Sequence, residues 1–251
     1  MDRIVFTAAG GAARVLEQQS VLSNNMANAN TTGFRAQLAN YRAVPFVAED
    51  GLPTRVATVT TTPGSDYSQG IMVETGRSLD VAIRGEGWFS VQTPTGEALT
   101  RAGDLGVNAQ SQLVTQQGLP VLSADNAPIT IPDRGTVTFG PDGTISVLGA
   151  GDRPTEIQAM GQLKLSKPDP ATLERGDDGF FRVRGPNAGA PVQADPTVRM
   201  VSGFIEKSNV SAAETMVGLI KNARQFELQM KVIQDASTNA ERANSILSSS
   251  G

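Results

Sequence analysis

The acidic residues that could do chemistry in this chain lie in two glycine-containing stretches. Asp177 and Asp178 are adjacent in one of them, and Asp80 and Glu86 flank a short apolar run in the other. Two well-placed carboxylates can act as general acid and base, as in glycoside hydrolysis. Adjacent acids in a glycine-rich loop are, however, more often solvated turn residues. The pattern alone therefore does not indicate an enzyme.

Other common catalytic groups are missing from the sequence. The 251 residues include no cysteine and no histidine, so thiol nucleophiles, the usual zinc ligands and the commonest general base are excluded. The glycines of Gly85-Glu86-Gly87 fail as a dinucleotide fingerprint, because Ser90 follows where a third glycine is needed and no helix is expected after it. We therefore expect no enzymatic activity, no cofactor and no metal.

Charge and hydropathy exclude two further classes of protein. The net charge is −4, and the 21 lysines and arginines are scattered along the chain, unlike a nucleic-acid-binding surface. The N-terminal MDRIVFTAAGGAARVLEQQ lacks the apolar run of a signal peptide, and no window is apolar enough to cross a membrane. We expect no nucleic acid, no membrane insertion and no cleaved signal peptide.

An N-terminal helix is the first element that could position a functional surface. Small and apolar residues recur with 4,3 spacing from Ile4 to Ala29 and predict an amphipathic helix over about residues 3–28. Its many alanines and glycines would permit close packing against another helix. The helix is expected to stop at Thr31-Thr32-Gly33, where the glycine can take a positive φ.

Asparagines are concentrated at the end of this helix, in VLSNNMANANTTGF (residues 21–34). Asparagine favours helix ends and turns, because its side chain competes for backbone hydrogen bonds. Two interpretations stay open. The stretch is a fraying polar helix end, or the amides of Asn24, Asn25 and Asn28 bond to other helices in a crowded bundle and fix its register.

A longer helix is predicted at the C-terminus. Ser211 and Glu214 form a capping box, which places the helix start near Ala212. From there a 4,3 apolar rhythm continues for five heptads to Leu247, which is a coiled-coil signal. The expected helix has about 35 residues and a length of roughly 50 Å.

The residues between the helices have the texture of β-structure. Period-2 apolar runs recur over residues 77–207, and the turn Gly140-Pro141-Asp142-Gly143 predicts a hairpin. Residues 34–76 contain RVATVTTT and GIMVET on either side of Pro63-Gly64. They are expected to form an extended β arm, with a hairpin around this turn as one arrangement.

The expected fold class is therefore α+β. Residues 1–33 and 208–251 would form a coiled-coil-like helical domain, residues 34–76 the β arm, and residues 77–207 a central antiparallel β domain. A lone helix pair has little core, so we expect it to order on assembly with neighbouring copies. An ordinary intramolecular core is the alternative for its apolar residues. The residues predicted to form a helical seam between subunits are Val15, Leu16, Leu22, Asn24, Asn25, Asn28, Met216, Leu219, Ala223, Phe226, Met230 and Ile233.

Several of these segments resemble one protein family. SNNMANANTTGFRAQ (residues 23–37) is similar to the N-terminal signature of the flagellar axial proteins, which comprise the rod, hook and hook-associated proteins. Residues 77–105 and 112–122 resemble the shared β-domain motif of the longer rod and hook proteins. Residues 201–233 resemble the C-terminal motif, with Glu206, Ser208, Asn209 and Val210 at its defining positions.

The resemblance implies a non-enzymatic structural subunit of the flagellar rod, the drive shaft that crosses the periplasm. Such a chain would be exported through the flagellar type III apparatus without a cleaved signal. It would polymerise helically with copies of itself and with other rod proteins, and transmit torque.

Two other assignments remain to be distinguished. The short arm at residues 34–55 resembles that of the proximal-rod protein, whereas the distal-rod protein is expected to carry a longer arm rich in Gln and Gly. The rival from a different class is a surface-binding β module on a coiled-coil stalk. That architecture would need one helix and a secretion signal, whereas helices are predicted at both ends of this chain.

Overall fold

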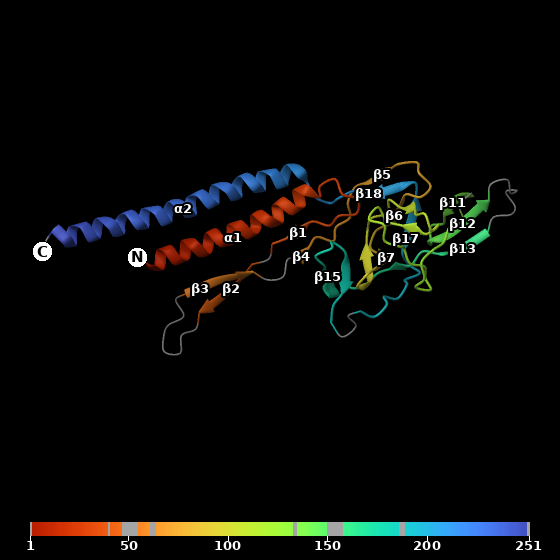
Figure 1. Ribbon diagram of the computed structural model, residues 1–251, viewed down its shortest axis with the longest axis horizontal. Coiled ribbons are helices and arrows are strands. Elements are labelled where there is room, and N and C mark those ends of the chain that lie inside the picture. Colours follow the sequence, from red (N-terminus) through yellow and green to blue (C-terminus); the bar gives the residue numbers. More distant parts are fainter. Residues whose placement is uncertain are drawn as a thin grey trace. The chain divides into compact units, whose positions relative to one another are not determined.

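The structure is a computed structural model. It describes residues 2–39, 41–46, 55–60, 64–132, 135–149, 158–185 and 189–249. The fold is α+β, as predicted. A helix lies near each end of the chain, and the residues between the two helices in the sequence form antiparallel sheets (Figure 1). The chain divides into two compact units: unit 1 comprises Met1–Ala29, Ala36–Asp66 and Val210–Gly251, and unit 2 comprises Asn30–Arg35 and Tyr67–Asn209.

Unit 1 is built on two long helices, α1 (Asp2–Ala27) and α2 (Ala212–Ser249). They lie side by side and antiparallel, with the two chain termini at the same end of the pair (Figure 1). The predicted start of α2 is confirmed, and the Glu214 N–H donates to Ser211 Oγ at 3.3 Å, as the capping box requires. Neither helix is long and apolar enough, over its described residues, to cross a membrane.

The described residues of unit 1 also contain four strands. The pairs are β1 (Gln37–Leu38) with β4 (Gly64–Ser65), and β2 (Tyr41–Phe46) with β3 (Arg55–Thr60), all antiparallel. A hairpin of RVATVTTT with GIMVET is therefore not the arrangement found, and residues 61–63 lie outside the described residues. The apolar pattern indicates extended chain but does not choose a strand's partner.

Unit 2 holds the other strands that the structure describes, and these strands pair in an antiparallel manner. The largest sheet has the order β14-β7-β8-β16-β15, a second has the order β11-β12-β13, and three further pairs are β17-β6, β18-β5 and β10-β9. The bounds are β5 (Met72–Glu74), β6 (Val81–Arg84), β7 (Trp88–Thr93), β8 (Gly96–Thr100), β9 (Gly106–Val107), β10 (Leu113–Val114), β11 (Gly135–Phe139), β12 (Thr144–Gly149), β13 (Gln158–Gln162), β14 (Leu165–Ser166), β15 (Leu173–Arg175), β16 (Phe181–Val183), β17 (Arg199–Ser202) and β18 (Phe204–Glu206), with a 3₁₀ turn η1 (Pro170–Thr172).

The core of unit 2 is aliphatic, with a smaller aromatic cluster beside it. Residues such as Val81, Val91 and Ile145 are completely buried in the main cluster, and the aromatic cluster gathers Trp88 and Phe181. The predicted hairpin is confirmed, because β11 pairs with β12 and the Gly143 N–H donates to Gly140 O at 3.0 Å. These strands hold in place the segments through which the chain enters and leaves the β-structure.

Candidate assembly interface

The contact between α1 and α2 is made by a mixture of small, polar and apolar side chains. Leu22 packs over Gly218, and the side chain of Gln229 packs over Gly11, where an added Cβ would lie only 3.0 Å from Gln229 Cδ. Glycine at these positions therefore lets each helix receive a large side chain from the other. The expectation that small residues permit close helix packing is confirmed for these sites.

The seam on α2 follows two series of positions, each with a spacing of seven residues. Leu219, Phe226 and Ile233 are half-buried and occupy the first series. Each member of the second series lies one residue before a position of the predicted apolar stripe. The members of the series are buried or half-buried, whereas the stripe residues Met216, Ala223 and Met230 are exposed. These members are Thr215, Asn222, Gln229 and Ala236.

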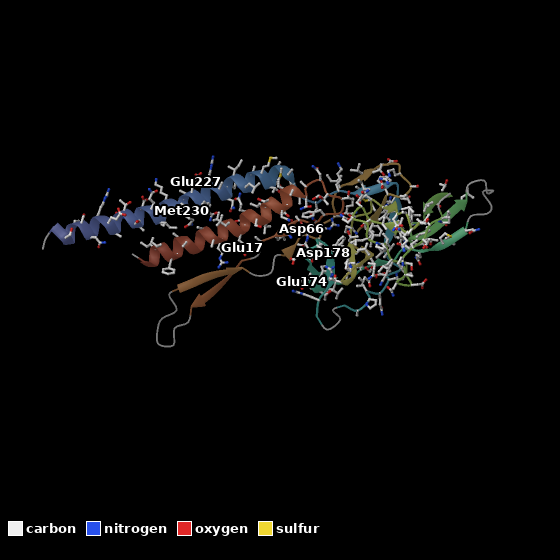
Figure 2. All side chains as sticks on the ribbon, viewed as in Figure 1. Glu17, Asp66, Glu174, Asp178, Glu227 and Met230 are labelled. Atoms are coloured by element: carbon white, nitrogen blue, oxygen red, sulfur yellow. The ribbon has the colours of Figure 1, made fainter. Side chains whose placement is uncertain are left out.

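The predicted residues next to this second series are exposed. Met216 is 50% exposed, Met230 is 45% exposed, and Ala223 is also exposed. Met230 can be followed on α2 in Figure 2. Repeating every seven residues, the three form a stripe beside the seam, here called the methionine stripe. It contributes little to packing within the chain and is free to contact another helix.

The predicted seam residues of α1 also divide between buried and exposed positions. Val15 is buried, Leu22 is half-buried against Gly218, and Leu16 is 57% exposed. Ile4 and Phe6 are exposed near the start of the helix as well. Val15 and Leu22 therefore have a place in the core between the two helices, whereas Leu16 belongs to an outer surface.

The asparagines at the end of α1 have different roles. The Asn25 side chain is buried, donates to Gln37 O at 2.9 Å and accepts from Gln37 N–H at 2.8 Å, so it pairs with one residue of β1 as a strand would. Asn28 donates to Asn24 O at 2.9 Å, within its own helix end, and Asn24 is exposed. Asn25 thus positions the start of the arm against α1. A role for these three amides between subunits stays a prediction.

A buried cluster of charged side chains lies in unit 2, where the chain enters and leaves the β-structure. Glu206 Oε1 lies 2.6 Å from Arg35 Nη1, and Glu206 Oε2 lies 2.8 Å from Arg101 Nη2. All three side chains are only 1–2% exposed. Arg35, Arg101 and Glu206 are here called the charge cluster. In so dry a site each charge depends on its partners, because water cannot replace them.

Further hydrogen bonds hold the charge cluster in place. Glu206 Oε1 accepts from Gly70 N–H at 2.8 Å, which draws this segment beside β18. Arg101 donates to Gly87 O and Gly85 O, each at 2.8 Å. Burial lowers the pKa of Arg101 to about 10, and the neighbouring Glu206 carboxylate opposes that shift.

The segments that carry these residues also meet through their backbones. Gly33 N–H donates to Glu206 O at 2.7 Å, and Asn209 N–H donates to Phe34 O at 3.3 Å. Gly33 takes φ +68°, as predicted, and a Cβ there would lie 2.3 Å from Ala102 N. The chain segment just after α1 and the one just before α2 therefore lie side by side in unit 2, at a point that only glycine fits.

An arginine of strand β15 adds a further contact to the same segment. Arg175 Cζ lies 4.3 Å from the centroid of the Phe34 ring, and Arg175 Nη1 donates to Arg35 O at 2.8 Å. The first contact is a cation–π interaction, and the second orients the guanidinium. Both fix the residues that precede the arm within unit 2.

Two of the carboxylates first considered for catalysis, Asp178 and Glu86, are engaged in ion pairs. Asp178 contacts Arg182 at 2.5 Å, and Glu86 contacts Lys167 at 2.8 Å. Hydrogen bonding to Arg182 lowers the pKa of Asp178, and hydrogen bonding to Lys167 lowers that of Glu86. Such carboxylates stay ionised and accept hydrogen bonds, the opposite of a general acid.

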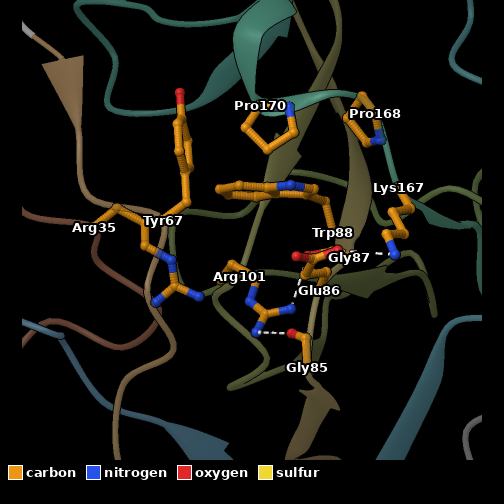
Figure 3. A pocket seen from close by; sticks show the side chains of 10 residues that line it. All are labelled: Arg35, Tyr67, Gly85, Glu86, Gly87, Trp88, Arg101, Lys167, Pro168 and Pro170. Carbon is orange, nitrogen blue, oxygen red and sulfur yellow. Dashed lines mark hydrogen bonds and ion pairs between the residues drawn. The ribbon is translucent and has the colours of Figure 1, made fainter.

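A small hollow lies next to the charge cluster. Its volume is about 70 Å³, and it is lined by Trp88, Tyr67 and Pro170 together with Arg35 and Arg101 (Figure 3). Figure 3 shows the Trp88 ring extended beneath Pro170, and Arg101 bonded to the glycine carbonyls of the β6–β7 turn. The hollow is too small for a cofactor or a drug-sized ligand. The glycines of Gly85-Glu86-Gly87 therefore serve to accept hydrogen bonds from Arg101.

The sequence motifs mark Glu206 but give no role to Arg35, Arg101 or Asn222. Nothing in the local pattern distinguishes these positions, because charged and amide residues usually lie on the surface. The one available signal is their place in or beside the family-like segments.

The helix pair, the β arm and the central antiparallel sheets agree with the architecture that the resemblance to the flagellar axial proteins predicts. Family models agree with this class over three stretches: "Flagella basal body rod protein" matches residues 7–35, "Flagellar hook protein FlgE/F/G D1 domain" matches residues 82–147, and "Flagellar basal body rod FlgEFG protein C-terminal" matches residues 201–246. The resemblance predicted from the motifs is thus confirmed.

Full-length relatives narrow the class further. The chain is 46% identical to the flagellar basal-body rod protein FlgF of Escherichia coli and 45% identical to that of Salmonella typhimurium, with all of each chain covered. It is 32% identical to the rod protein FlgG of Agrobacterium fabrum, with 91% of each chain covered. The chain belongs to the FlgF family of flagellar basal-body rod proteins.

Proposed function

We propose that this chain is a structural subunit of the proximal rod of the flagellar basal body and that it polymerises helically through α1 and α2. Full-length identity of 46% to a FlgF protein supports the proximal position. The proposal includes export through the flagellar type III apparatus without a cleaved signal. It also includes assembly in the periplasm with copies of itself and with other rod proteins, and the transmission of torque.

The methionine stripe is the observation that carries the assembly proposal. A pair of helices needs one seam, and here that seam is supplied by the series of Leu219 and Asn222. The methionine stripe and the exposed Ile220 and Leu228 form additional apolar surface on the same helix. A helix with apolar surface beyond its seam is suited to an array in which each helix has several neighbours, as in coiled coils of more than two strands.

The difference in length between the helices supports the same proposal. α2 has 38 residues and α1 has 26, and α2 continues past the start of α1 in Figure 1. Ile246 is 67% exposed in this extension. Packing of the extension on a neighbouring subunit would join successive copies head to tail, and such heterologous contacts generate an open helix.

Substitutions at the methionine stripe test the proposal. Met230→Glu and Met216→Glu should leave the thermal unfolding of the purified chain unchanged, since both side chains are about half exposed. They should abolish swimming in a strain whose only copy is the variant, and remove the protein from isolated hook–basal-body particles. In the assembled rod, the negative charge of the new glutamate would have to be buried without a partner.

Met160→Glu is a matched control for these variants. Met160 is 36% exposed on β13 in unit 2, so the same substitution is made at similar exposure but away from the helices. It should leave both swimming and incorporation intact. Incorporation of Met230→Glu at the wild-type level would contradict a role of the methionine stripe in assembly.

Quantitative mass spectrometry of hook–basal-body particles distinguishes the proximal rod from the distal rod. A proximal subunit should be present in few copies and be retained after the distal rod and hook are sheared away. A high copy number that falls with the distal rod would instead favour the distal-rod assignment. Absence from the particles would favour the stalked binding module.

A further inference from the structure

We propose that Asn222 is a positioning residue that fixes the antiparallel register of α1 against α2. Its amide Nδ2 donates to Val15 O at 2.7 Å and to Gln19 Oε1 at 2.9 Å. Asn222 is only 3% exposed, so this amide has no access to bulk water. The inference concerns the fold of a single chain and does not depend on its assembly.

The hydrogen bonds of Asn222 are specific to one alignment of the helices. A shift by one heptad in either direction would place Asn222 opposite Ala8 and Ala12, or opposite Leu22 and Met26, instead of Val15 and Gln19. The backbone carbonyl of Ala8 or Leu22 could take the place of Val15 O, but none of those four side chains has an oxygen to take the place of Gln19 Oε1. One N–H of the amide would then be buried without a good acceptor, so the shifted alignments should be about tenfold less populated on this ground alone.

Part of the seam consists of short side chains, which select an alignment only weakly. The buried residues on α1 include Ala8 and Ala12, and the seam of α2 ends in the buried Ala236. Short side chains form a smooth surface that tolerates sliding, because few ridges have to leave their grooves. The contacts of Leu22 with Gly218 and of Gln229 with Gly11 also favour the native alignment, and Asn222 adds the polar contribution.

The other atom of the same amide supports a role in specificity. Among the described residues, Asn222 Oδ1 has no hydrogen-bond partner although it is buried. A leucine would fill this position without that cost. A buried asparagine in a helix seam is known to trade stability for a defined register, and the single-sided bonding of Asn222 fits that trade.

Disulfide trapping reports the register directly, because the chain has no cysteine of its own. Gly11→Cys with Gln229→Cys forms the native pair, since the Gln229 side chain lies against Gly11. Gly11→Cys with Ala236→Cys, and Gln18→Cys with Thr215→Cys, report shifts of one heptad in the two directions. Seven helical residues span about 10 Å, which exceeds the reach of a disulfide, so each pair reports one register only.

The purified full-length chain with Asn222 should form the native disulfide at least about tenfold faster than either shifted one. Asn222→Leu should reduce the preference for the native disulfide several-fold while helicity, measured by circular dichroism, stays the same or increases. Asn239→Leu is the matched control, because Asn239 is an exposed asparagine of the same helix, and it should keep the native preference.

Two results would overturn the proposal. One is equal trapping of all three pairs in the chain with native Asn222, and the other is an undiminished preference in Asn222→Leu. Should Asn222→Leu lose its helicity, Gln19→Leu provides the second test, because it removes one of the two acceptors and leaves Asn222 in place. An unchanged preference in that variant would equally contradict the role of Asn222.

Discussion

The charge cluster predicts a large and selective effect of neutralising Glu206. In Glu206→Gln the side chain keeps nearly the same shape but loses the charge that faces Arg35 Nη1 at 2.6 Å and Arg101 Nη2 at 2.8 Å. Both arginines would remain buried without a counter-charge. Removing one partner from a buried ion pair costs about 3–5 kcal/mol, mostly through the uncompensated charge that is left. The free energy of unfolding of the β-structure should fall by that amount.

Differential scanning calorimetry of the full-length chain measures this loss. For a folded unit of this size each kcal/mol corresponds to about 2–4 °C, so the transition of unit 2 should move down by about 6–20 °C. Hydrogen exchange should also become faster in residues 30–35 and at Gly70, because the Glu206 carboxylate pairs with Arg35 and accepts from Gly70 N–H. Faster exchange there than in the rest of unit 2 would show that stability is lost at the charge cluster.

Glu86→Gln is the matched control for this variant. Glu86 makes an ion pair with Lys167 at 2.8 Å, similar in length, but its side chain is 75% exposed. Water can solvate either charge, so no resolvable change in stability is expected. If Glu206→Gln and Glu86→Gln had the same transition temperature, the reasoning that burial makes the charge cluster essential for stability would be refuted. Replacing Arg35, Arg101 and Glu206 together by Met, Met and Leu should cost less than Glu206→Gln alone.

Two further predictions concern other residues of unit 2, Gly33 and Asp104. Gly33→Ala should lower the free energy of unfolding by more than about 2 kcal/mol, because the φ of Gly33 is +68° and the new Cβ would lie 2.3 Å from Ala102 N. Gly76→Ala is the control, because Gly76 has φ +70° but open space around it, and this variant should lose clearly less. Equal losses of the two variants in chemical denaturation would contradict the steric argument. Burial raises the pKa of Asp104, and the nearby Asp80 carboxylate adds to that shift, so ionised Asp104 weakens the folded state above the raised pKa. Asp104→Asn should therefore melt at a higher temperature than the native chain at neutral pH, with a gain that shrinks as the pH falls through the carboxyl range, whereas a gain independent of pH would exclude this cause.

The local sequence alone determined the helices, their ends and one hairpin. The bounds of α1 and the start of α2 followed from 4,3 spacing and from the capping box of Ser211 and Glu214. The positive φ of Gly33 followed from its residue type, although α1 already ends at Ala27. The β11–β12 hairpin followed from its glycine-containing turn. These features depend on residues within a few positions of one another, so the pattern carries the information needed to predict them. The motifs, which are also short and local, likewise indicated the family.

Tertiary structure alone decided which segments meet. Gly70 bonds to a residue 136 positions away, and Asn222 bonds to one 207 positions away. On α2 the apolar pattern identified the series of Leu219, whereas the second seam series contains Thr215 and Asn222 in place of the methionine stripe. Hydrophobicity ranks side chains by the benefit of burial, but a polar side chain is buried wherever a distant partner satisfies it. That partner is absent from the local sequence, so the charge cluster and the register of the helix pair are properties of the folded chain alone.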